Sequence, residues 1–189
     1  VAVSNGRLIN FSKNENTSSF TWSISNPINN YGVNINIGNY INFSDYHDGE
    51  KGLLQMEFYV LKHNLEKAKI HFKEARKMMK AFEHWFGPYP FYEDTYKLVE
   101  VPYLGMEHQS SVTYGNKFKN GYLGSDLSGT GWGLKFDFII VHESGHEWFA
   151  NSITNKDAAD MWIHEGFTTY AENLFLDYHY GKRASADYV

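Results

Sequence analysis

The feature that most constrains the fold is a change in the spacing of apolar residues near position 62. Before that point, four apolar side chains alternate with more polar ones: Leu54, Met56, Phe58 and Val60. Such alternation is typical of a strand with one buried face. From residue 65 to residue 86 apolar side chains recur every three or four positions, which is the spacing of an amphipathic helix. A chain that makes this change combines sheet and helix around a core, so the sequence predicts an α+β fold.

Residues 1–61 are rich in Asn, Ser, Gly and Tyr and contain short runs that favour strands. We predict strands at 19–25, 33–37 and 40–43, with a turn at Gly38 and Asn39 between the last two. A second turn is indicated by the Asp48-Gly49 dipeptide. We interpret this region as the C-terminal part of an antiparallel β domain.

Residues 62–189 have a mixed, helix-rich pattern. We predict a long helix over 64–86, in which Asn64 is the N-cap and Gly87-Pro88 marks the end. The other elements that we predict are strands at 95–101 and 110–114, a Gly-rich loop at 120–133, a helix at 134–150, and a helix at 161–180 capped by Asp160.

Composition excludes several classes of function. The formal net charge is -5 and no basic stripe stands out, so nucleic acid is not an expected partner. The absence of cysteine excludes disulfides and thiolate zinc sites, so a zinc site here has to use His and carboxylates. No apolar run reaches the ~20 residues that a membrane span needs.

The two ends of the chain indicate a fragment of a longer protein. It begins without Met inside a strand-like stretch and ends at Val189 without a closing feature. No signal-peptide pattern is present, so the compartment stays open, and a bacterial periplasmic or secreted location is compatible with the sequence.

The candidate metal site begins with His142-Glu143-Ser144-Gly145-His146, an H-E-x-x-H pattern. On a helix, residues i and i+4 lie on one face, so both imidazoles can reach one zinc ion. Glu143 is turned about 100° away around the helix axis, which suits a base for the attacking water rather than a ligand. A solvated charged face is the alternative. The apolar residues on both sides favour a buried helix, where such side chains need a partner such as a metal.

A zinc peptidase site needs a third protein ligand. Glu165 lies 19 residues after His146 on the next predicted helix, and an antiparallel helix pair can return its carboxylate to the first helix. We predict one zinc ion per chain, bound by His142, His146 and Glu165. Glu172, two turns after Glu165, is either a surface carboxylate or the partner of a ligand imidazole.

This spacing, with the segment Trp162-Ile163-His164-Glu165-Gly166-Phe167, resembles the M1 family of zinc aminopeptidases, which belongs to the gluzincin group. The usual family pattern in this segment is W-L-N-E-G-F. Ile163 and His164 depart from it at positions that supply no metal chemistry in the family, so His164 is not expected to bind the metal.

A second signature, Gly105-Met106-Glu107-His108, resembles the G-x-M-E-N motif of the same family. In that family the Glu binds the free N-terminal ammonium of the peptide, and the Gly-x-Met backbone pairs with the substrate as an edge strand. The resemblance implies that Gly105, Met106 and Glu107 bind peptides with a free N-terminus. His108 replaces the family Asn, which affects the shape of the first side-chain pocket.

The resemblance spans nearly the whole chain. It implies that residues 1–61 are the end of the family's N-terminal β domain and that 62–189 are the first half of its thermolysin-like catalytic domain. The transition-state Tyr of the family would then lie beyond Val189, so we expect the fragment alone to be inactive.

The leading hypothesis is a zinc-dependent aminopeptidase that hydrolyses the N-terminal peptide bond of peptides, with Glu143 as general base. One alternative is a zinc endopeptidase or a hydrolase with two functions, and Glu107 argues against a plain endopeptidase. The other alternative is a zinc-containing binding or scaffold protein without activity, and the intact Glu143 argues against it.

Overall fold

The computed structural model describes all of residues 1–189 and has the α+β architecture that the sequence predicts. Its main sheet contains five strands in the order β5-β6-β7-β9-β8. An antiparallel hairpin comprises β5 (Tyr40–Gly49) and β6 (Gly52–Leu61). The turn between them is at Glu50 and Lys51, so the predicted turn dipeptide Asp48-Gly49 is instead the paired end of β5. Parallel pairing adds β7 (Tyr96–Glu100) and β9 (Val112–Tyr114), and the short β8 (Gly105–Met106) closes one edge.

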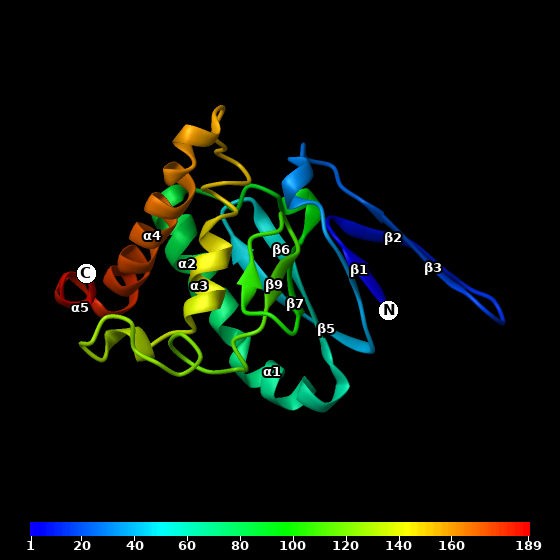
Figure 1. The fold of residues 1–189 in the computed structure, drawn as a ribbon, viewed down its shortest axis with the longest axis horizontal. Coiled ribbons are helices and arrows are strands. Elements are labelled where there is room, and N and C mark those ends of the chain that lie inside the picture. The colour runs from blue at the N-terminus through cyan, green and yellow to red at the C-terminus, as the bar shows by residue number, and fades with distance from the viewer.

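The N-terminal strands lie on the opposite side of this sheet from the helices (Figure 1). They form two separate two-stranded sheets, β1-β4 and β2-β3, with bounds Ala2–Ser4 for β1, Arg7–Lys13 for β2, Ser18–Ser23 for β3 and Ile35–Ile37 for β4. A small apolar cluster, in which Val3 and Trp22 pack with Tyr59 and Val99, connects these strands to the main sheet.

The turn predicted at Gly38 and Asn39 does not make a hairpin. β4 pairs with β1, and β5 pairs with β6, so the two strands that flank this turn belong to different sheets. Gly38 and Asn39 are typical turn residues, but β4 and β5 each pair with a strand elsewhere in the sequence rather than with each other. The main sheet also continues across residue 61, because β6 pairs with both β5 and β7. The domain division at residue 61 therefore stays a proposal.

Five α-helices and five short 3-10 helices complete the fold. The α-helices are α1 (Leu65–His71), α2 (Lys73–Phe86), α3 (Phe138–Gly145), α4 (Trp162–Tyr180) and α5 (Lys182–Tyr188). The 3-10 helices are η1 (Asn30–Gly32), η2 (Lys62–Asn64), η3 (Tyr92–Asp94), η4 (Trp132–Leu134) and η5 (Ala158–Asp160). Helices α2, α3 and α4 contact one another, and α3 also contacts β8 and β9 (Figure 1). None of the helices combines the length and the apolar character that a membrane span requires.

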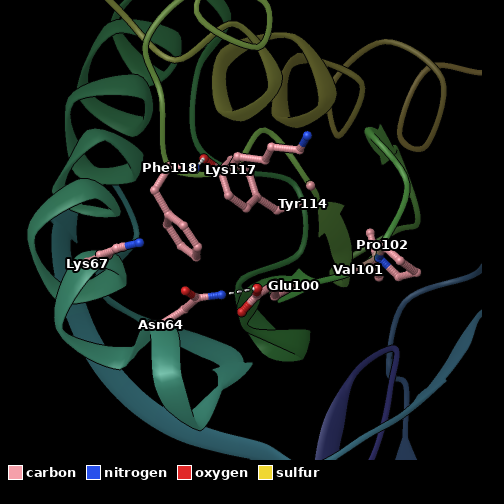
Figure 2. Close-up of a pocket in the computed structure, with 9 residues that line it drawn as sticks. Asn64, Lys67, Glu100, Val101, Pro102, Tyr114, Lys117 and Phe118 are labelled. Atoms are coloured by element: carbon pink, nitrogen blue, oxygen red, sulfur yellow. Dashed lines mark hydrogen bonds between the residues drawn. The ribbon is translucent and has the colours of Figure 1, made fainter.

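The helix predicted over 64–86 is divided into α1 and α2 at Phe72. Phe72 is 1% exposed, and its ring centroid lies 5.3 Å from that of Phe58 and 4.9 Å from that of Tyr114. Core packing of this ring accompanies the break, which periodicity alone does not reveal. Asn64 precedes α1 but makes no capping hydrogen bond. Its side chain instead donates to Oε1 of Glu100 at 2.6 Å, as Figure 2 shows.

Two other helix predictions need correction. The helix predicted over 134–150 begins only at Phe138, after Asp137, whose Oδ1 accepts a hydrogen bond from the backbone N–H of Ile140 at 3.1 Å. It ends at Gly145, a poor helix former. The cap predicted at Asp160 is also wrong, because Met161 occupies the N-cap position of α4 without a side-chain hydrogen bond.

Burial of α3 positions the candidate metal site. Its residues Ile139, Ile140 and Val141 are at most 1% exposed and belong to a core cluster of 25 residues between the sheet and the helices. Asp137 at its start also accepts hydrogen bonds from the Tyr114 hydroxyl at 2.7 Å and from Asn116 Nδ2 at 2.9 Å. The helix that carries the H-E-x-x-H pattern is therefore held at its N-terminus and along its inner face.

Candidate metal centre

Three predicted ligands converge where α3 meets α4. Each of His142, His146 and Glu165 offers one ligand atom, and these atoms lie within 4.8 Å of one another. Nε2 of His142 lies 3.1 Å from Oε2 of Glu165, and Nε2 of His146 lies 3.6 Å from Oε1 of the same carboxylate. Glu165 is in the first turn of α4, and the connection at 146–161 brings this turn back to the end of α3, as predicted.

The second nitrogen of each imidazole is already engaged. Nδ1 of His142 lies 2.7 Å from Oε1 of Glu172, a carboxylate acceptor, which requires the N–H on Nδ1. Nδ1 of His146 lies 3.0 Å from the carbonyl oxygen of Phe149 and 3.1 Å from the Thr168 hydroxyl. Both Nε2 lone pairs are then left facing Glu165. This is the arrangement in which neutral imidazoles bind a divalent metal, and the N, N, O donor set suits zinc.

Glu172 resolves an alternative that the sequence left open. Its side chain is 3% exposed, so it is not a surface carboxylate. Its Oε2 accepts a hydrogen bond of 2.6 Å from the Tyr188 hydroxyl, while Oε1 holds His142. His164, in contrast, belongs to no cluster of metal-ligating side chains. It is 5% exposed, and its Nε2 accepts from the backbone N–H of Asn155 at 3.3 Å.

Glu143 lies next to the cluster in a buried position. Its exposed fraction is 9%, and burial raises the pKa of its carboxyl to about 7. The negative charges of Glu107 and Glu165 act in the same direction, while His142 acts in the opposite one. A carboxyl group with a pKa near 7 exchanges protons readily at neutral pH, as a general base or acid must.

The Gly105–Met106 segment is β8, the edge strand of the main sheet, beside β9. A side chain at Gly105 has no room, because a Cβ there would lie 2.8 Å from Ile139 Cγ2 and 3.1 Å from Glu143 Oε1. The strand therefore approaches α3 closely. Glu107 follows it directly and brings its carboxylate into a second cluster with Glu143 and His146, whose polar atoms also lie within 4.8 Å of one another.

His108 is partly buried beside this cluster. Its Nδ1 is buried without a hydrogen-bond partner, and burial lowers the pKa of the imidazole. The residue that replaces the family Asn is therefore neutral at neutral pH.

Three residues of the site were missed by the sequence analysis. The Tyr31 hydroxyl donates to Oε1 of Glu107 at 2.9 Å, and Nδ2 of Asn151 donates to the Glu107 carbonyl oxygen at 2.8 Å. Glu147 is completely buried, accepts from the backbone N–H of Ser110 at 2.7 Å, and has a pKa that burial raises to about 8. A charged residue inside an apolar run was a usable signal for Glu147. Nothing near Tyr31 in the sequence pointed to Glu107.

Of two hollows in the surface, one borders the candidate metal centre and the other does not. One of about 370 Å³ is lined by His142, Glu172 and Tyr188, so it lies on the Glu172 side of the ligand imidazole. The hollow in Figure 2, of about 300 Å³, is lined by Asn64, Glu100 and their neighbours, and none of the predicted site residues lines it.

Comparison with known proteins agrees with this geometry. The chain is 34% identical to human aminopeptidase N over 97 residues, which are 50% of this chain and 10% of that protein. It is 28% identical to tricorn protease-interacting factor F2 of Thermoplasma acidophilum over 114 residues, which are 59% of this chain and 14% of that protein. The matches thus cover only a small part of the length of these relatives.

Solved structures share the fold. The M1 zinc metallopeptidase of Deinococcus radiodurans superposes with a TM-score of 0.76 and 20% identity, over 94% of this chain and 38% of that one. Legionella pneumophila aminopeptidase A gives a TM-score of 0.76 and 22% identity, over 96% and 22%. The model of the peptidase family M1 domain matches residues 70–189, which include both signature motifs and all three predicted ligands, so the chain belongs to the M1 peptidase family.

Proposed function

We propose that this chain carries the metal centre and the substrate-amine anchor of a zinc aminopeptidase. The observation that supports this best is the convergence of His142 and His146 on Glu165, with Glu143 and Glu107 clustered beside His146. A purely structural metal site has no use for the last two carboxylates.

The chemistry follows from the donor set. A zinc ion bound by His142, His146 and Glu165 would lower the pKa of a water molecule towards ~7 and polarise the carbonyl of the scissile bond. Glu143 accepts the proton of the attacking water and passes it to the departing amine. Burial raises the pKa of this carboxyl above its usual value, which favours acceptance of that proton.

The substrate is oriented by the edge of the sheet. The backbone of Gly105 and Met106 in β8 pairs with an extended peptide, because an edge strand has unpaired N–H and C=O groups. Glu107 then binds the ammonium group at the N-terminus of that peptide. A carboxylate close to the metal selects a free amine and places the first peptide bond at the reactive centre, so the products are a single amino acid and a shortened peptide.

Specificity for a free N-terminus tests the proposal. In the full-length protein, Glu107→Ala is expected to lower kcat/KM for peptides with a free N-terminus by roughly ten- to a hundredfold, because a charge-assisted hydrogen bond contributes ~1.5–3 kcal/mol. N-acetylated versions of the same peptides are expected to be poor substrates, with rates that the substitution leaves nearly unchanged. The measurement is the ratio of kcat/KM between the two substrate types. Glu15→Ala, which removes an exposed carboxylate from the β2–β3 turn, is the control.

A parent protein that cleaves free and blocked peptides equally well would contradict the amine anchor, as would a Glu107→Ala variant that slows both equally. Cleavage of blocked peptides with zinc bound would instead indicate the endopeptidase alternative.

A further inference from the structure

Two segments that lie far apart in the sequence meet at Glu107. Tyr31 lies in η1 (Asn30–Gly32), in the N-terminal part of the chain, 76 residues before Glu107. Its hydroxyl donates a hydrogen bond of 2.9 Å to Oε1 of Glu107. Tyr31 is 37% exposed, so this hydrogen bond lies at the surface of the molecule.

The position of η1 is fixed independently of that contact. The buried side chain of Asn5 donates from Nδ2 to the carbonyl oxygens of Gly32, at 2.9 Å, and of Gln109, at 2.6 Å. Asn5 thus joins η1 directly to the loop that carries Glu107. On the other side of Tyr31, Asn29 caps the turn by accepting from the Tyr31 backbone N–H. The tyrosine hydroxyl therefore approaches Glu107 from a rigid support.

The chemistry of the donor also matters. Burial raises the pKa of the Tyr31 phenol well above its usual value, and the charge of Glu107 raises it further, so the group stays a neutral donor at any working pH. A Lys or Arg in this place would neutralise Glu107 and remove the charge that an ammonium group needs. A neutral hydroxyl orients the carboxylate and leaves its charge intact.

Glu107 needs such an orienting partner. Its polar atoms cluster with those of Glu143 and His146 within 4.8 Å, so an unrestrained carboxylate could turn towards the metal and join the ligands. Holding Oε1 at Tyr31 keeps the carboxylate on the substrate side.

We propose that Tyr31 is a positioning residue for substrate selection, which holds Oε1 of Glu107 so that Oε2 is presented to the N-terminal ammonium of a peptide. This inference rests on the proposed function of Glu107. Through the Tyr31 hydroxyl, the N-terminal part of the chain contributes to substrate selection.

The test is Tyr31→Phe in the full-length protein, which removes the hydroxyl and keeps the ring. The ratio of kcat/KM between free and N-acetylated peptides is expected to fall roughly three- to tenfold, less than in Glu107→Ala, because Glu107 retains its charge. The ratio does not depend on the fraction of folded enzyme, so a folding defect cannot imitate the effect. Tyr46→Phe is the matched control, since Tyr46 is half exposed on β5 and its hydroxyl has no hydrogen-bond partner within the chain.

A double-mutant cycle separates this inference from the proposed function. If Tyr31 acts through Glu107, Tyr31→Phe changes the ratio no further in a Glu107→Ala background. An unchanged ratio in Tyr31→Phe, while Glu107→Ala lowers it, would overturn the inference and leave the amine anchor intact. Additive effects of the two substitutions would also overturn it. A parent with no preference for free peptides would overturn the amine anchor and the inference together.

Discussion

The proposed metal centre and the proposed amine anchor are neighbours in space, because His146 belongs to the clusters of both, but they differ in how the chain forms them. The proposed metal centre combines His142, His146 and Glu165, which lie on or beside two consecutive helices, with 23 positions from the first to the last. The anchor pairs Glu107, which follows an edge strand, with Tyr31, which lies 76 residues earlier.

The two parts of the site therefore differ in how far apart in the sequence their residues lie. The spacing of ligands along helices determines the metal chemistry, so it is local in sequence. Orientation of the anchor depends on how the N-terminal strands dock on the sheet. That docking uses Asp94, whose carboxylate accepts from the backbone N–H groups of Ser25 at 2.6 Å and Asn26 at 3.0 Å, and the buried Lys97, which donates to the carbonyl oxygen of Gly6.

Rates on peptides with free and with blocked N-termini distinguish the two parts of the site. Damage to the metal centre should slow free and blocked peptides alike, whereas damage to the anchor should change only the ratio between them.

Removal of a ligand has the largest expected effect. His142→Ala should lose most of its zinc under conditions in which the parent binds one ion per chain, because two protein ligands remain of the three that a catalytic zinc site uses. Metal analysis after dialysis is the measurement. His63→Ala, which removes an exposed imidazole from η2, is the control and should keep its zinc. Full zinc occupancy in His142→Ala would refute the ligand assignment.

Removal of the base comes next. Glu143→Gln should retain zinc but lose roughly 10²–10⁴-fold in kcat, because an amide cannot accept the proton of the attacking water. Both substrate types should lose activity by the same factor. Glu66→Gln, at an exposed position of α1, should behave like the parent. Near-normal turnover with zinc bound would mean that another group acts as the base.

The sequence could predict which side chains meet at the candidate metal centre, because their spacing along the chain is local. The i and i+4 spacing of His142 and His146 and the distance to Glu165 are read directly from the chain, and the structure brings these three side chains together. The strand alternation that ends at Val60 and the helix end at Gly87 also follow local rules, and both are confirmed.

What could not be predicted depends on partners distant in sequence. Strand β4 pairs with β1 rather than β5, and Phe72 interrupts a regular helical pattern where its ring joins the core. The side chain of Asn64 donates a hydrogen bond to Glu100 instead of capping α1, because the fold brings Glu100 within reach. Tyr31 is the functional example, since no local pattern connects it with Glu107.

Among the substitutions at the candidate metal centre, the weakest effect is expected at Glu172, the carboxylate that contacts His142. Its Oε1 lies 2.7 Å from Nδ1 of the imidazole, and this contact orients the ring and makes Nε2 a better donor to the metal. Glu172→Gln preserves the shape and an acceptor oxygen but removes the charge. Zinc affinity should fall by roughly ten- to a hundredfold, measured by competition with a chelator of known affinity. The preference for free over blocked peptides, measured at saturating zinc, should not change.

Asp177→Asn provides the matched control, because it removes a carboxylate from the same helix five residues further on, near its C-terminal end. A negative charge there is unfavourable for the helix dipole, so its loss should not destabilise α4. Equal zinc affinity in Glu172→Gln and the parent would mean that the charge of Glu172 is not needed to orient the His142 imidazole. A changed ratio of kcat/KM between free and N-acetylated peptides in Glu172→Gln would show that the metal centre and the amine anchor are coupled, and would contradict their independence.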